Sequence, residues 1–224
     1  MPLFAHAHTD DPLSLATEDD IVLVGVREVL GHGIVDLLGE KGLYVTGSDA
    51  VKRIEGVYTL TTTYELKSTA LAFNLNADIG GYRVQNVSVN CTSRTFPQVT
   101  ITSVKPGNGS FCAVLAGGVN TVTISGGFGM VNLWGATCTE PISSTMNIGG
   151  QTAMAIAGTS GEILTLGLAV YGWKKSCTLE GYVLPTLGDG TYQSEGTDDL
   201  PVSARDGMKT YSKGWQADLA FAVP

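Results

Sequence analysis

The sequence predicts an all-β protein: an antiparallel β-sandwich or barrel with an extended N-terminal arm and at most one short helix. Apolar and polar side chains alternate over residues 83–92 and again over 98–104, and period two is typical of strands with one buried face. The 29 glycines favour turns and disfavour long helices. Short segments of strand character recur throughout the chain, which is typical of sandwiches and barrels.

The two alternating segments are expected to pair with each other. In the first, Val87, Val89 and Cys91 share one face, while the residues between them are polar. The second segment places Val99 and Ile101 in the same alternation. Since proline cannot donate to a sheet hydrogen bond, Pro97 belongs to the connection or to a strand start. We therefore expect a central antiparallel pair with one polar and one apolar face.

The remaining elements follow from the same signals. Asp206-Gly207 predicts a hairpin turn, residues 34–38 fit either a helical turn or a strand, and Ser48 or Asp49 is the expected cap of one short helix over residues 50–55. The other expected strands, in chain order, are 21–24, 57–67, 70–77, 111–116, 119–125, 128–138, 151–157, 163–173 (ending at Trp173-Lys174-Lys175), 178–184 and 208–221.

Two domain-level features are expected: an extended arm over residues 1–20 and a single β-rich domain over residues 21–224. Residues 1–20 are polar and show no period, while residues 188–199 form an acidic, glycine-rich loop. Segments of this kind order when they are tied down by a contact. The candidate inter-subunit contacts are Phe4, Asp10, Asp11, Asp189, Glu195, Asp198 and Asp199.

Composition narrows the function class. Charged residues make up 15% of the chain, against about 25% in typical domains, so much of the surface is expected to face protein. The formal charge of −8 argues against nucleic-acid binding by a basic patch, although an acidic wall lets DNA pass without sticking. No apolar run approaches the length of a membrane span, and the N-terminus lacks the order of a signal peptide. Four widely spaced cysteines are expected to be reduced thiols, buried by default.

We expect no catalytic, cofactor or metal site. His6 and His8, with Asp10, resemble the His-x-His metal pair of the amidohydrolase family. That family needs further histidines and a βα alternation, whereas here only His32 remains. The acidic loop lacks the spacing of a calcium loop, and Ser160 does not lie in a Gly-x-Ser-x-Gly motif.

The pattern as a whole resembles the virion proteins of tailed bacteriophages. The residues that carry this resemblance are the polar-faced strand Val84–Thr92, the Thr95-Phe96-Pro97 corner, the strand Val99–Val104, and the Asp206-Gly207 hairpin leading into Met208–Phe221. Within that group the chain is most similar to tail tube proteins, in which sheets from several subunits close into a β-lined channel. Such proteins usually carry a clear helix on the sandwich, which this chain supplies at most once.

The resemblance implies a non-enzymatic structural subunit, present in the virion and made in the host cytoplasm. Its expected partners are further copies of itself in a ring or lattice, together with other virion proteins. It needs no cofactor, binds no membrane and binds no nucleic acid specifically, with DNA passing an acidic lumen. Two alternatives stay open: a capsid decoration protein, and a receptor- or glycan-binding β-sandwich module.

Overall fold

The computed structural model describes residues 11–17, 19–36, 51–112, 121–131, 136–138, 140–157, 165–182, 186–187, 201–205 and 208–218. Strands dominate these residues, and none of them is helical, so the predicted all-β class is confirmed. The strands are β1 (Ile21–Asp36), β2 (Val51–Leu66), β3 (Leu71–Asn74), β4 (Arg83–Thr92), β5 (Gln98–Pro106), β6 (Gly109–Phe111), β7 (Thr121–Ile124), β8 (Ala136–Thr137), β9 (Pro141–Ala157), β10 (Thr165–Gly181), β11 (Thr186–Leu187), β12 (Pro201–Arg205) and β13 (Met208–Asp218).

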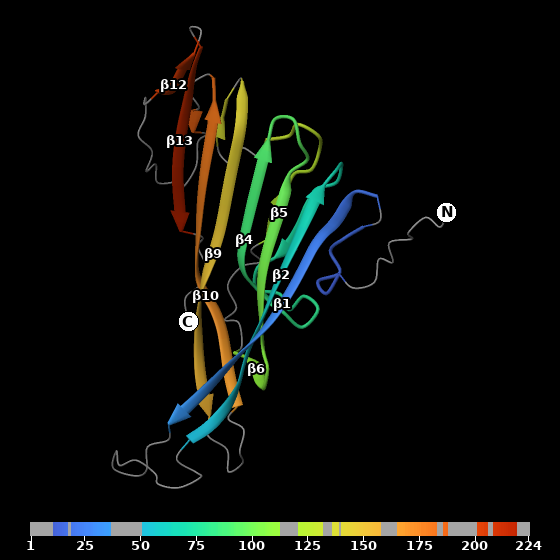
Figure 1. The fold of residues 1–224 in the computed structure, drawn as a ribbon, viewed down its shortest axis with the longest axis vertical. Coiled ribbons are helices and arrows are strands. Elements are labelled where there is room, and N and C mark those ends of the chain that lie inside the picture. Colours follow the sequence, from blue (N-terminus) through green and yellow to red (C-terminus); the bar gives the residue numbers. More distant parts are fainter. Residues whose placement is uncertain are drawn as a thin grey trace.

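One large, mostly antiparallel sheet forms the body of the molecule (Figure 1). Its strand order is β1-β2-β5-β4-β9-β10-β13-β12, and β6 joins β10 from outside this path. The strand pair β3–β7 forms a small second sheet, and β8–β11 a third. The large sheet does not close on itself, so the architecture is sandwich-like and not a closed barrel.

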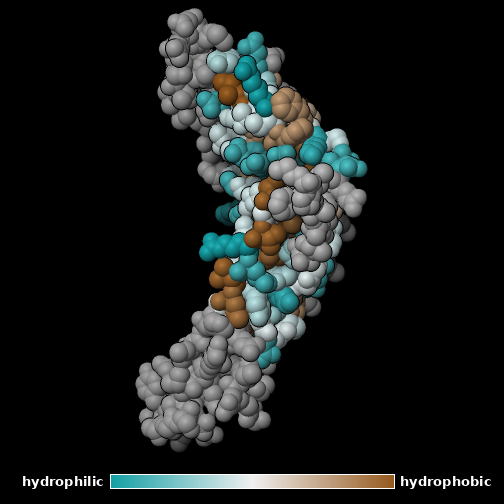
Figure 2. Space-filling model, turned by 45° about the vertical axis from the view of Figure 1, so that its right-hand side comes forward, coloured by the Kyte–Doolittle hydropathy of each residue, from teal (hydrophilic) through white to brown (hydrophobic). Residues whose placement is uncertain are grey.

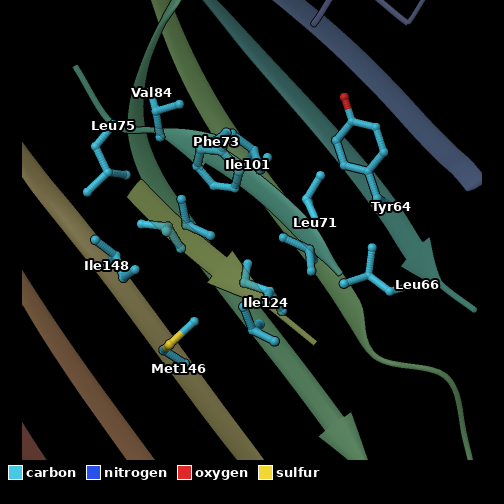
Figure 3. Close-up of a cluster of buried hydrophobic side chains, with 14 of the residues drawn as sticks. Tyr64, Leu66, Leu71, Phe73, Leu75, Val84, Ile101, Ile124, Met146 and Ile148 are labelled. Carbon is cyan, nitrogen blue, oxygen red and sulfur yellow. The ribbon is translucent and has the colours of Figure 1, made fainter. Parts of the chain in front are cut away.

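The core lies between the large sheet and β3–β7. Figure 3 shows Leu71 and Phe73 of β3 and Ile124 of β7 facing side chains from β2, β5, β4 and β9. The residues of the large sheet in this cluster include Tyr64, Leu66, Val84, Ile101, Met146 and Ile148, each at most 4% exposed. Apolar burial is the main driving force for folding, so this packing fixes which face of each strand is inside.

The predicted central pair is confirmed with its expected faces. β4 pairs with β5 antiparallel, with Val89 opposite Val99 and Val87 opposite Ile101, and all four side chains are buried. The strands on either side of the predicted hairpin turn pair antiparallel, with Arg205 opposite Met208, whereas the turn residues Asp206 and Gly207 lie outside the described residues.

The antiparallel pair of β9 and β10, here called the β9–β10 ribbon, crosses over itself near its middle (Figure 1). Gly172 and Trp173 together lie opposite Gly150, which makes a β-bulge between the register pairs at Tyr171 and Lys174. Above this bulge β9 pairs with β4, and below it β10 pairs in parallel with β6. The two strands cross near the middle of the view in Figure 1. A Cβ at Gly150 would lie 2.8 Å from Val170 Cγ1 and 3.1 Å from the Trp173 ring, so the crossing needs glycine there.

Three sequence expectations about secondary structure were wrong. The strand expected over residues 128–138 is not formed at its start, where Phe128 and Gly129 lie in a turn, and the strand described within this range is the short β8. Residues 50–55 were expected to be helical, but Val51–Leu66 is one strand that pairs with β1 from end to end. Pairing with the long partner strand outweighs a possible cap. The strand expected to stop at Lys174-Lys175 instead continues to Gly181, because a bulge lets a strand bend without ending.

Residues 11–17 cross the end of the large sheet and enter its core. Leu13 is 2% exposed. The backbone oxygen of Pro12 is so close to Gly80 that a Cβ there would lie 1.9 Å from it. This part of the predicted arm therefore packs on its own subunit, whereas the division into an arm and one domain stays a prediction.

The contact between Pro12 and Gly80 gives a prediction with a matched control. Gly80 (φ 58°) and Gly81 (φ 83°) are both left-handed, but a Cβ at Gly81 meets nothing within 4 Å. Both alanine variants carry the strain of left-handed backbone, about 1–2 kcal/mol. Only Gly80→Ala also displaces residues 11–17, so its unfolding free energy should fall further. Urea unfolding of both variants checks this, and equal losses would contradict the packing.

Candidate assembly surfaces

The outward face of the large sheet is covered by uncharged polar side chains. Its central row crosses five neighbouring strands: the register places Thr63 opposite Thr100, Thr100 opposite Ser88, Ser88 opposite Asn147, and Asn147 opposite Ser176. The rows on either side continue the pattern, and none of these side chains is buried. We call this surface the hydroxyl–amide face; it comprises Thr61, Thr63, Asn86, Ser88, Asn90, Gln98, Thr100, Thr102, Thr145, Asn147, Ser176 and Thr178.

The side chains of the hydroxyl–amide face are hydrogen-bonding groups without formal charge. Thr63 and Thr100 already bond each other, with 3.2 Å between their hydroxyl oxygens. In the described pairings, charged residues flank the face at Arg27, Glu65, Lys174 and Glu180, where the rows end. Hydroxyls and amides both donate and accept hydrogen bonds. In the described pairings the carboxylate of Glu65 lies opposite the Gln98 amide.

The second surface is the outer edge of β1. In the part of the chain that the structure describes, β1 pairs only with β2. Three valines on this strand are strongly exposed: Val24 (52%), Val26 (48%) and Val29 (45%). Val26 lies opposite Thr62, a buried residue, whereas Val29 lies opposite Thr59 on the outward face. The apolar side chains of β1 are thus uncovered on both faces of the sheet.

Glu28 is a charged residue on the inward side of β1, opposite the buried Leu60. The Tyr82 hydroxyl donates a hydrogen bond to the Glu28 carboxylate. Burial, together with this bond, raises the pKa of Tyr82 to about 12. Lys105 lies 5.3 Å from the centre of the same ring. Arg27 is therefore the one charged side chain on β1 between Ile21 and Gly31 that is free of such a contact in the described residues.

Asp11 is the one predicted contact residue that the structure describes. One of its carboxylate oxygens accepts hydrogen bonds from the Tyr64 hydroxyl at 2.6 Å and the Leu13 amide at 3.1 Å; the other accepts from the amides of Leu15 and Ala16. Burial and the Asp11 bond raise the pKa of Tyr64. Asp11 therefore fastens residues 11–17 to β2 within one subunit, and a contact with a neighbour stays a prediction.

The other predicted positions lie outside the described residues. These are the contact candidates Phe4, Asp10, Asp189, Glu195, Asp198 and Asp199, and the histidines His6 and His8. Among the described side chains, no group of three or more His, Cys, Asp or Glu residues is placed to hold a metal ion. The same part of the chain has no helix with the length and hydropathy of a membrane span.

All four cysteines are free thiols. Cys91 and Cys177 are buried, as expected, and Cys138 is half-buried. Cys112 is exposed, so the expectation of buried thiols was wrong at this position. It directly follows Phe111, the last residue of β6.

Sequence reasoning did not identify the hydroxyl–amide face as a site. Its β4 and β5 contributions were recognised as polar strand faces, but β9 was expected only from residue 151. The missed signal is the alternation of Thr145 and Asn147 with Met146 and Ile148. That alternation gives β9 the same two faces as β4, which it joins.

Lys175 is the most unusual ionisable group in the described part of the chain. It lies on the inward face of β10, 2% exposed, between Trp173 and Cys177. Burial lowers its pKa from 10.5 to about 8, while the nearby Cys177 opposes the shift slightly. Burial also raises the pKa of the Cys177 thiol to about 11. The folded protein therefore disfavours the charged form of Lys175.

The lowered pKa predicts a specific pH dependence. Between pH 8 and pH 10.5 the unfolded chain holds a proton on Lys175 that the folded chain has lost, so unfolding free energy rises with pH in this window. Relative to Lys175→Met, the wild type should gain stability across the window and show a constant difference below it. Lys174→Met, at an exposed neighbour, is the control. Denaturant unfolding at several pH values checks this; a flat difference would refute it.

No protein family model matches this chain, and no curated protein matches it at a significant level.

Proposed function

We propose that this chain is a non-enzymatic structural subunit of a phage particle that assembles with copies of itself, most specifically as the tail tube that channels DNA. The observation that carries the proposal is the hydroxyl–amide face, which crosses five strands without an interior charge. The proposal places the protein in the virion, after synthesis in the host cytoplasm, with other virion proteins as further partners.

A tube wall sets physical requirements that this sheet meets. One sheet face must line the channel and must not retain DNA, which binds clustered lysine and arginine through its phosphates. Hydroxyl and amide side chains keep that face wet without attracting phosphate, and the net charge of −8 adds a weak repulsion. The opposite face is already buried under β3–β7. Neighbouring subunits then need to join only at sheet edges.

A second candidate is a receptor- or glycan-binding module. Tyr171 (45% exposed) and Tyr182 (41% exposed) lie on β10 and directly after it, and aromatic rings beside hydroxyl and amide groups are typical of sugar-binding surfaces. Capsid decoration is a further assembly role that shares the surface requirements of the tube, and only its location in the particle differs.

The test begins with the purified full-length protein. Negative-stain microscopy and sedimentation velocity should show rings or tubes that grow with concentration. Deleting residues 1–10, which leaves Leu13 and the Asp11–Tyr64 hydrogen bond in place, should weaken them. A glycan array distinguishes the second candidate. Binding that is lost in Tyr171→Ala or Tyr182→Ala, from a protein that stays monomeric, would replace the assembly proposal with the glycan-binding one.

A further inference from the structure

We draw no further inference here: the strongest candidate, the outer edge of β1 with its exposed valines Val24, Val26 and Val29 on the side of the molecule that Figure 2 brings forward, carries none because nothing in the described residues shows what covers this edge.

Discussion

A Trp173→Ala variant is expected to lose about 3–5 kcal/mol of unfolding free energy. Trp173 is 2% exposed, and its ring lies against Gly150 where the β9–β10 ribbon turns over. Removing the ring leaves a cavity under the crossing, and the surrounding strands cannot collapse to fill it because each is fixed by pairing on both sides of the bulge.

The matched control is Tyr171→Ala, two residues earlier on the same strand. Tyr171 is 45% exposed, so its loss should change stability by less than about 1 kcal/mol. Both variants are measured by guanidinium unfolding followed by circular dichroism. If the two losses were equal, Trp173 would not support the crossing, and the two halves of the ribbon would be independent.

The second large effect concerns the two faces of β4. Val89→Lys should lose about 4 kcal/mol or more, because Val89 is 1% exposed between Val99 and Met146 and a lysine there is an unpaired buried charge. Ser88→Lys changes the adjacent residue on the hydroxyl–amide face, and this variant should fold with nearly wild-type stability.

The Ser88→Lys variant also tests the role of the face. If this face lines a channel, assembled Ser88→Lys particles carry a ring of lysines there and should retain short duplex DNA in low salt, as the wild type does not. Retention should disappear as salt rises. Ser88→Asn is the uncharged control. If assembled Ser88→Lys particles bound no DNA at any salt concentration, the hydroxyl–amide face would not line the channel.

The fold class was predictable because the alternation of apolar and polar residues within single strands also determines which face of the whole sheet is buried. From Val87 to Cys91 in β4 and from Val99 to Ser103 in β5 every second residue is buried, so alternation in the sequence maps directly onto one sheet face. The alternation of apolar and polar residues failed to predict a strand where a charged residue is buried. Lys175 takes a buried position normally held by an apolar residue, so the sequence indicated a strand end inside β10.

The candidate surfaces were less predictable. The hydroxyl–amide face depends on strand order, since Thr63 and Ser176 meet in one row only after β2, β5, β4, β9 and β10 have paired. Strand order is set by long-range contacts that no local pattern encodes. The role of Asp11 also depends on a long-range contact. Its charge indicated an interface, whereas in the structure its carboxylate accepts hydrogen bonds from Tyr64 and from backbone amides in the turn at residues 11–16.

The most direct measurement is electron cryomicroscopy of the purified full-length protein at high concentration. We predict a closed ring or tube in which the hydroxyl–amide face lines the lumen. A strictly monomeric particle at the same concentration, or an assembly with that face buried between copies, would contradict this account.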